Sequence, residues 1–342
     1  MPKKAARKGQ GPLQMSDLAK IAGVSESTVS RALADHPTVA QATRVRIKAL
    51  ANELGYRINP IARSLRAGRS GVIAVVVPLQ HDRNGHLTDP FMMTMLTYLA
   101  DELTSRGYSM LLSKAVQESG AWLDSTLAQS IAEGLVIIGQ SHEHEAINAA
   151  AERGAPLVAW GAQMPGQAYP CVGSDNHAGG LIATRHLIRQ GRRRIAFLGD
   201  ERLPEVAHRY AGYREALAGA GIDDDPRLHL RAPFAADEAY RAFRGLLAQD
   251  VPLDGVVAAS DVIAISAIRA LNDRGVRVPQ DVSVVGYDDV PLAQYTHPAL
   301  TTVRQDLQRG AELLTLSLIE RLNGGDPRPA PIAPSLVIRE SA

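Results

Sequence analysis

The stretch SESTVSRAL, residues 25–33, gathers hydroxyl, carboxylate and guanidinium side chains on one short segment with a helical pattern. Such side chains suit the major groove of DNA, because Ser and Thr reach phosphates and base edges, Arg pairs bidentately with guanine, and Glu accepts a hydrogen bond from cytosine. The side chains predicted to face outward are Glu26, Ser27, Ser30 and Arg31. We interpret the segment as a DNA-reading helix; the alternative is an ordinary solvated face of a small helical domain.

Three short helical patterns, over residues 15–22, 25–34 and 41–54, would hold this segment in place. Gly23 suits the left-handed end of the first helix, and Ser25 is placed to cap the second helix through its hydroxyl. Two helices that are joined by a tight turn and braced by a third describe a helix-turn-helix. The apolar side chains expected in its small core are Leu18, Ile21, Val24, Val29, Leu33, Ile47, Leu50 and Leu54.

The charge of the chain is unevenly distributed, although the net charge is only +1. Residues 1–69 carry 13 Lys and Arg against 4 Asp and Glu, a formal charge of +9, whereas the remaining residues carry −8. This asymmetry indicates a polyanionic partner for the N-terminal part alone.

From residue 71 onward, apolar runs alternate with amphipathic segments of helical length. Such alternation predicts parallel sheets covered by helices on both faces, and the number of runs is enough for two sheets. A chain of 342 residues is also too long for one ordinary core. The predicted strands are 72–77, 109–113, 135–139, 156–160, 171–175, 194–200, 255–261, 282–289 and 300–306. The predicted helices are 91–106, 121–132, 143–152, 177–190, 209–220, 236–248 and 262–274.

The cysteine content and the length of the apolar runs indicate the cellular compartment to which the sequence is suited. Cys171 is the only cysteine, which excludes an intrachain disulfide and favours a reducing environment. The longest apolar run, which begins at Gly71, is far shorter than a membrane span, and the basic segment 1–12 lacks the apolar region of a signal peptide. We therefore expect a cytoplasmic protein with a disordered basic tail and no membrane partner.

Longer stretches of the sequence resemble the lactose/galactose repressor (LacI/GalR) family of bacterial transcriptional regulators. The stretches that carry the resemblance are 13–33, 43–78, DPF at 89–91, SDNHAGG at 174–180, 186–200, RYAGYREAL at 209–217, and 278–306. The resemblance covers essentially all of residues 13–342. It implies a repressor of carbohydrate-utilisation genes that binds a pseudo-palindromic operator as a homodimer, associates with the nucleoid when bound, and is released by a sugar effector. Corepression by the effector is the alternative that the sequence leaves open.

The family's fold is α/β and divides this chain into a DNA-binding head and a two-part body. The head is an N-terminal three-helix helix-turn-helix domain followed by a hinge helix, and the body is a periplasmic-binding-protein-like core of two doubly wound parallel-sheet subdomains. The expected divisions are a tail at 1–12, the helix-turn-helix domain at 13–58, the hinge at 59–70, and the core at 71–342. Within the core, one subdomain is expected to comprise 71–172 with 304–326, and the other 173–303 with 327–342.

The resemblance also assigns DNA contacts by position. In the head these positions are Met15, Ser16, Ser25, Glu26, Ser27, Thr28, Ser30, Arg31, Thr38 and Thr43, and in the hinge they are Asn59, Ala62, Leu65 and Arg66. Leu65 holds the place of an apolar wedge that would enter the minor groove and unstack a base step. Ala40 departs from the family, which often has a serine there to cap the third helix. A plain basic linker is the alternative for the hinge.

Ligands of open α/β sheets bind beyond the carboxyl ends of the strands, where Asp175, Asp200, Asp261 and Asp288 end predicted strands here. We expect these carboxylates to gather at one cleft and to accept hydrogen bonds from sugar hydroxyls. With the resemblance, the predicted effector-binding residues are Asp89, Phe91, Trp160, Ser174, Asp175, Arg209, Phe234, Ser260, Asp261 and Asp288. The three aromatic residues would form a stacking wall for a sugar; packing in the core is the alternative for each.

Residues 80–87 lengthen the loop after the first strand relative to the family, and we expect them to shape effector choice unless they are a simple surface insertion. An enzyme is the less favoured reading. The histidines near residues 81–86 and 142–144 lack the spacing of known metal motifs, and no nucleotide-binding or nucleophile-elbow motif is present. We predict no metal and no cofactor. A sugar-binding protein without DNA activity is a further alternative, which the +9 head argues against.

Overall fold

The computed structural model describes residues 13–56, 70–78, 89–115, 123, 132–141 and 143–342. The chain divides into two compact units, 1–70 and 71–342, and each is considered by itself. The predictions for the tail (1–12), for the insertion (80–87), for most of the helix at 121–132, and for Asn59, Ala62, Leu65 and Arg66 lie outside the described residues.

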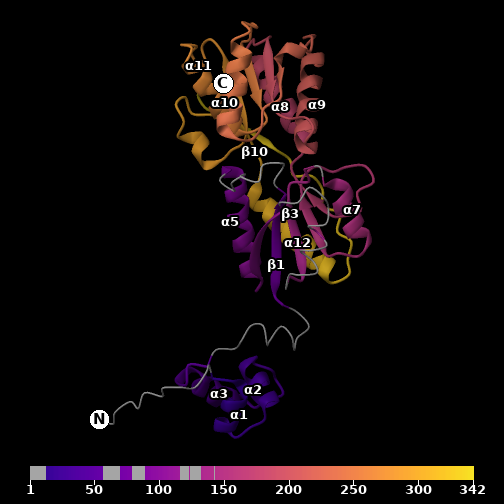
Figure 1. Cartoon of the computed structure of the whole chain (residues 1–342), viewed down its shortest axis with the longest axis vertical. Coiled ribbons are helices and arrows are strands. Elements are labelled where there is room, and N and C mark those ends of the chain that lie inside the picture. Colours follow the sequence, from indigo (N-terminus) through magenta and orange to yellow (C-terminus); the bar gives the residue numbers. More distant parts are fainter. Residues whose placement is uncertain (1–12, 57–69, 79–88, 116–122, 124–131, 142) are drawn as a thin grey trace, which may run out of the picture. The chain divides into compact units, whose positions relative to one another are not determined.

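The first unit contains the three predicted helices, α1 (Met15–Ala22), α2 (Glu26–Leu33) and α3 (Gln41–Glu53) (Figure 1). Gly23 ends α1 with a left-handed φ of 66°, which a residue without a β-carbon adopts at little cost. The Ser25 hydroxyl accepts the Thr28 backbone N–H at 3.2 Å and so caps α2. Both capping predictions are confirmed.

The core of this unit is smaller than predicted. Leu18, Val29 and Ile47 are fully buried, but Ile21 is 52% exposed and Leu54 is 37% exposed, so the predictions for these two residues are wrong. Leu54 lies just beyond the end of α3, and the inward face of α1 is instead filled by alanines. The small residues that complete the core are Ala19, Ala22, Ala32, Val39 and Ala51.

The second unit contains two separate sheets. The first is entirely parallel, with the order β2-β1-β3-β4-β5. Its strands are β1 (Val72–Pro78), β2 (Ser109–Ala115), β3 (Gly134–Ile138), β4 (Leu157–Trp160) and β5 (Cys171–Val172). Helices α5 (Pro90–Ser105) and α12 (Leu307–Leu322) cover one face, and α7 (His144–Glu152) covers the other. Both faces are therefore apolar, as the continuous Val and Ile runs predict.

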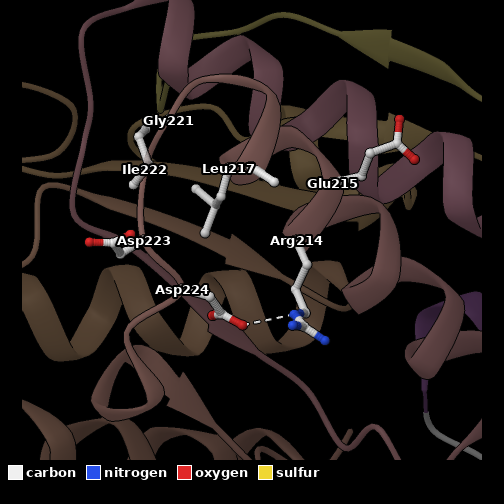
Figure 2. Close-up of a pocket in the computed structure, with 8 residues that line it drawn as sticks. Arg214, Glu215, Leu217, Gly221, Ile222, Asp223 and Asp224 are labelled. Carbon is white, nitrogen blue, oxygen red and sulfur yellow. Dashed lines mark ion pairs between the residues drawn. The ribbon is translucent and has the colours of Figure 1, made fainter.

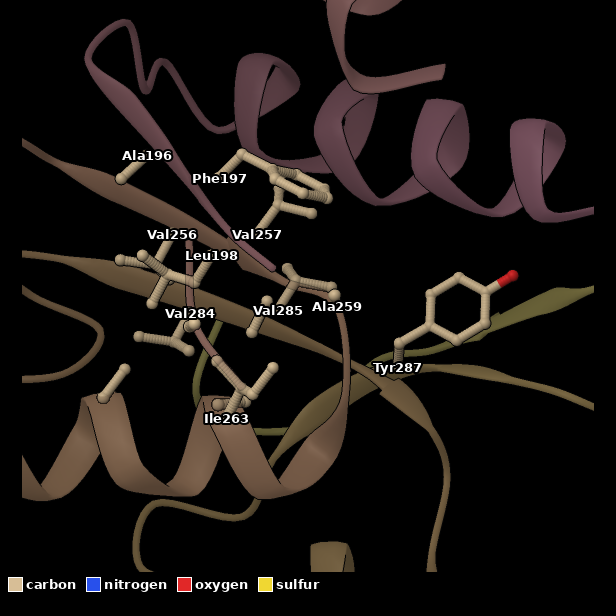
Figure 3. Close-up of a cluster of buried hydrophobic side chains, with 14 of the residues drawn as sticks. Ala196, Phe197, Leu198, Val256, Val257, Ala259, Ile263, Val284, Val285 and Tyr287 are labelled. Atoms are coloured by element: carbon tan, nitrogen blue, oxygen red, sulfur yellow. The ribbon is translucent and has the colours of Figure 1, made fainter. Parts of the chain in front are cut away.

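The second sheet has the order β11-β10-β9-β8-β6-β7. Its strands are β6 (Ile195–Leu198), β7 (His229–Leu230), β8 (Gly255–Ala258), β9 (Ser283–Asp288), β10 (Thr301–Arg304) and β11 (Ser335–Val337). Its helices are α8 (Asn176–Arg189), α9 (Pro204–Gly219), α10 (Ala236–Leu247) and α11 (Asp261–Asn272), with short 3-10 turns at Pro226–Leu228 and Pro291–Gln294. Figure 1 shows α8 beside α9 and α10 beside α11, and Figure 3 shows the core that the central strands contribute.

All nine predicted strands are present, although several are shorter than expected. Strand β11 pairs antiparallel with β10, which departs from the all-parallel prediction. The chain passes between the sheets after β5, after β10 and before β11. Two of these segments lie side by side, because the Asp175 N–H donates to the Ile332 carbonyl and the Ile332 N–H donates to the Gly173 carbonyl, each at 2.9 Å. The two sheets are thus joined by a narrow bundle of chain segments.

Candidate functional sites

The polar face of α2 is available to a partner. Glu26, Ser27 and Arg31 are exposed, while Thr28 and Ser30 are half-buried. The Ser25 hydroxyl is 2.8 Å from the hydroxyls of both Ser27 and Thr28, which forms a cluster of hydroxyls at the start of the helix. Among the described residues, none forms an ion pair with Arg31. The structure therefore places the predicted base-reading side chains together on one accessible face.

The predicted phosphate contacts lie elsewhere in the same unit. Met15 and Ser16 are half-buried in the first turn of α1, Thr43 is half-buried in α3, and Thr38 is exposed with its hydroxyl 2.9 Å from His36 Nδ1. Ala40 begins α3 without a side-chain cap, which leaves N–H groups of the first turn for another acceptor.

In the second unit, Arg209 is the most closely held of the predicted effector residues. Arg209 lies in α9 and is buried. Its Nε donates to Asn176 Oδ1 at 2.8 Å, a second guanidinium nitrogen donates to the Ala259 carbonyl, and its charged carbon is 3.7 Å from the centre of the Tyr287 ring. These contacts fix a cation at the carboxyl ends of β8 and β9.

Asp288 ends β9 as a buried carboxylate. Its φ of 117° is unfavourable for a residue other than glycine, so the surroundings must hold it in place. Gln305 Nε2 donates to Asp288 Oδ1 at 2.7 Å, and the next residue, Asp289, forms ion pairs with Arg304 and Arg339 at 2.7 and 2.6 Å. Burial raises the pKa of Asp288 well above its usual range, the Arg209 charge lowers it, and the charges of Asp261 and Asp89 raise it further.

Partners within the protein already engage two of the strand-end carboxylates, Asp200 and Asp261, so the gathering of these carboxylates at one cleft stays a prediction. Asp200 forms ion pairs with Arg202 and Arg231. Asp261 is fully buried, and both of its carboxyl oxygens have partners. One oxygen accepts from the Thr302 hydroxyl, and the other accepts from the Val290 N–H at 2.8 Å.

Two other predicted contacts prove to be helix caps. Asp175 is exposed and accepts the Ala178 N–H at 2.9 Å, which caps α8. Ser260 is buried and accepts the Ile263 N–H at 3.2 Å, which caps α11. A polar residue at a strand end can serve the following helix as well as a ligand, so a role in effector binding stays a prediction for both residues.

The buried Asp261 makes stability depend on pH. Burial raises its pKa to about 7 from an ordinary 3.8, so the folded state holds a proton that the unfolded state has already released at pH 5–6. Stability should therefore fall as pH rises from about 4 to 7. Asp261→Asn, which keeps an acceptor for the Val290 N–H and a donor for Thr302, should flatten this part of the stability–pH curve, measured by urea unfolding. The exposed substitution Asp223→Asn should leave the slope unchanged; an equal slope in wild type and Asp261→Asn would contradict the expectation.

Part of the predicted aromatic wall is buried in the hydrophobic core. The rings of Phe91 and Trp160 are 6.2 Å apart, and Trp160 is only 4% exposed. The Trp160 ring packs so closely on Gly310 of α12 that a β-carbon there would overlap it. Phe91 packs against the cores of both sheets, whereas Phe234 is half-exposed in the loop before α10. Stacking of a sugar on these rings stays a prediction.

Asp89 and Ser174 complete the set of residues where the two sheets meet. Asp89 caps α5 by accepting the Met92 N–H at 3.1 Å, and burial raises the pKa of its carboxyl. Ser174 is buried in the segment that leaves the first sheet, and its hydroxyl has no partner among the described residues. We call the region formed by Asp89, Phe91, Arg209, Asp288 and Gln305 the junction.

Sequence reasoning missed Asn176 and Gln305 of this region. Both are buried amides that immediately follow strands or strand-end residues, and both contact a predicted effector residue. A buried polar side chain beside a strand end was the available signal.

One distinct hollow, of about 510 Å³, lies away from the junction (Figure 2). It is lined by the end of α9 and the following loop, including Leu217 and Ile222, with Arg214 and Asp224 paired at 2.8 Å. None of the predicted effector residues lines it, so it does not compete with the junction as the predicted site.

Comparison with known proteins agrees with this arrangement. Residues 14–59 match the model of bacterial regulatory proteins of the lacI family, and residues 184–342 match that of a periplasmic binding protein-like domain. The HTH-type transcriptional regulator CelR of Thermobifida fusca is 33% identical over 332 residues, which cover 95% of this chain and 96% of CelR. The chain belongs to the LacI family. This LacI-family protein is therefore a DNA-binding transcriptional regulator, and the relatives it resembles are regulators rather than enzymes.

Solved structures extend the comparison. A CelR–cellobiose complex matches this LacI-family chain with a TM-score of 0.73 and 31% identity, covering 96% of this chain and 100% of the other. The lac repressor dimer bound to operator and the anti-inducer ONPF matches with a TM-score of 0.83 and 24% identity, covering 97% and 99%, which shows the shared fold. None of the helices in the described part of the chain is both long and apolar enough to cross a membrane.

Proposed function

We propose that this LacI-family regulator represses carbohydrate-utilisation genes in the bacterial cytoplasm by binding a pseudo-palindromic operator as a homodimer. A sugar effector binds at the junction and releases the DNA. The observation that carries the effector proposal is the presence of a rigidly held cation, Arg209, and a strained, buried carboxylate, Asp288, at neighbouring strand ends. Together they offer a donor and an acceptor to sugar hydroxyls, and the 31% identical CelR binds cellobiose in its solved complex.

Exposed apolar side chains support the dimer. Met93 of α5 and both Leu111 and Leu112 of the edge strand β2 are exposed, and α5 packs beside β2. Tyr295, in the second half of the core, is 77% exposed. An edge strand with exposed apolar side chains is a surface that a second copy of the chain would bury.

The narrow link between the sheets supports coupling of the effector to DNA. Asp288 belongs to the second sheet, and Gln305, which holds it, lies on the segment that leads to α12 against the first sheet. A ligand at the junction would therefore bias the angle between the sheets. Coupling free energies between two such sites are typically about 1–3 kcal/mol, or roughly 5- to 150-fold in affinity.

Selection from a random duplex library with the full-length protein tests the proposal. At moderate ionic strength we expect enrichment of a pseudo-palindrome and a steep loss of affinity as salt rises. A sugar panel should then contain a compound that weakens the complex. Absence of any preference over scrambled duplex would overturn the proposal, and a sugar that strengthens the complex would favour corepression instead.

Arg31→Ala should weaken binding to the selected operator by about 1–3 kcal/mol while affecting random duplex less, because a bidentate base contact discriminates by that amount. Fluorescence anisotropy on both duplexes measures the difference. Arg241→Ala, which removes an exposed positive charge from α10, serves as the control and should change neither affinity. Equal losses on operator and random DNA would show that Arg31 contacts phosphate rather than a base.

A further inference from the structure

The turn between α2 and α3 carries an exposed histidine, His36. Its backbone N–H donates to the Arg31 carbonyl at 2.9 Å, so the turn begins directly at the end of α2. The Val39 N–H donates to the His36 carbonyl at 3.2 Å, and the buried Val39 side chain belongs to the core of the first unit. These contacts hold His36 at the surface, next to the last turn of the helix that carries the predicted base-reading side chains.

Thr38, one of the predicted phosphate contacts, orients the His36 ring. The Thr38 hydroxyl lies 2.9 Å from His36 Nδ1, and the Thr38 backbone N–H donates to the same nitrogen at 3.4 Å. Since a backbone N–H can only donate, Nδ1 accepts in this arrangement, and the neutral ring carries its hydrogen on Nε2. The Thr38 hydroxyl then also donates to Nδ1, so its hydrogen is not available to a phosphate.

The charged groups of the surrounding elements give the His36 ring no counter-charge. The Asp35 carboxylate, in the same turn, is paired with Lys48 of α3 at 2.6 Å, and Arg44 of α3 donates to the Asp35 carbonyl at 2.9 Å. Arg31 of α2 is exposed, and within the described part of the chain neither Arg31 nor His36 forms an ion pair. A proton on His36 therefore joins a group of cations, which a DNA phosphate stabilises.

We propose that His36 contacts a phosphate of the DNA backbone and that its protonation strengthens DNA binding. Protonation adds a hydrogen to Nδ1, which then donates to the Thr38 oxygen. The Thr38 hydroxyl is thereby released to donate to phosphate, and Nε2–H donates a charge-assisted hydrogen bond to the same DNA backbone. The first N–H groups of α3, which Ala40 leaves uncapped, follow in the chain and favour the same anion.

This inference rests on the DNA binding of the LacI-family protein and not on the identity of its operator or effector. A phosphate contact carries no sequence information, so random duplex tests it as well as a selected operator does. Fluorescence anisotropy of the full-length protein at constant salt, between about pH 6 and pH 8, covers the range in which histidine ordinarily changes its charge. The wild type should bind both duplexes about tenfold or more tightly at the lower pH.

His36→Gln replaces the ring with an amide that can still accept from Thr38 but is neutral at every pH. Its affinity should match wild type at the higher pH, which shows that the first unit is folded, and should rise little at the lower pH. The slope of log affinity against log salt should be steeper at the lower pH by about 0.9 for each bound DNA-binding head in the wild type, and unchanged in His36→Gln.

Two further variants separate the parts of the mechanism. Thr38→Val removes the hydroxyl but keeps the backbone N–H, so its pH response should be smaller than that of the wild type but not absent. His186→Gln makes the same histidine-to-glutamine change in α8 of the second unit and should keep the full response. Calorimetry in buffers of different ionisation enthalpy should show proton uptake when the wild type binds DNA, because protonation and DNA binding are reciprocally linked.

A wild-type affinity for random duplex that does not change with pH overturns the role of His36, and so does a full pH response in His36→Gln. A full response in Thr38→Val overturns the release of its hydroxyl. Failure of the operator proposal gives a different result: the wild type then shows no preference between duplexes, while its affinity for both still rises at the lower pH.

Discussion

Arg209→Ala is expected to abolish the effector response of the protein while leaving its affinity for operator within a few-fold of wild type. The substitution removes the cation that donates to Asn176 and Ala259 and lies over Tyr287. Hydrogen bonds from a charged group contribute about 1.5–3 kcal/mol each, so effector affinity should fall roughly 10- to 150-fold or more. Operator anisotropy with and without effector measures both quantities.

Arg209→Lys provides a second variant, because it keeps the charge but loses the planar fork, and it should also respond poorly. Arg214→Ala removes an exposed arginine from the same helix and should behave as wild type. A normal effector response from Arg209→Ala would remove Arg209 from the binding site and leave the proposal without its principal donor.

Gly180→Val is expected to destabilise the second sheet's subdomain by about 3 kcal/mol or more. A β-carbon at Gly180 would collide with the backbone oxygen of Arg209, and one at Gly212 would collide with that of His177. Helices α8 and α9 therefore touch backbone to backbone, and a larger residue forces them apart because a backbone atom cannot rotate away. Since Arg209 belongs to this contact, the variant should also lose effector affinity at temperatures where it remains folded.

Thermal unfolding measures the effect, with an expected fall in Tm of about 2–4 °C for each kcal/mol in a unit of this size. Gly245→Ala is the matched control, since Gly245 lies in α10 with nothing near its missing β-carbon. That change should stabilise the helix slightly, by about 0.5–1 kcal/mol. Equal Tm values for wild type and Gly180→Val would show that α8 and α9 can separate at little cost.

Most of the strands were predictable because they are continuous apolar runs that are buried on both faces, although the edge strand β2 exposes Leu111 and Leu112. β7 and β11 were not, since two or three half-buried residues carry no periodic signal. Helix α12 was missed although Leu307, Ala311, Leu314 and Leu318 repeat at helical spacing. Its place against the first sheet depends on a long-range return of the chain, which local pattern does not reveal.

The site was less predictable than the fold because the hydrogen-bond and ion-pair partners of a carboxylate determine whether it is left to bind a ligand. Asp200, Asp261 and Asp288 all end strands, yet only Asp288 lacks an arginine partner or a full set of hydrogen bonds among the described residues. Those partners come from distant segments: Arg231 lies 31 residues beyond Asp200, and Thr302 lies 41 residues beyond Asp261. Such pairings depend on the register of non-adjacent strands, which the sequence pattern leaves undetermined.

The position of Gln305 means that a small rotation at the junction corresponds to a larger displacement at the far end of the first sheet. Its side-chain amide holds Asp288 at the carboxyl end of β9, beside the segment that connects β10 to α12 against the first sheet. Strand β1 begins at Val72, at the opposite end of the first sheet. Strand β1 has seven residues and is about 20 Å long, so a rotation of roughly 10° about the connecting segment would move the far end of β1 by about 3–4 Å. A change in this single contact would therefore shift the start of β1 by roughly the spacing of stacked base pairs.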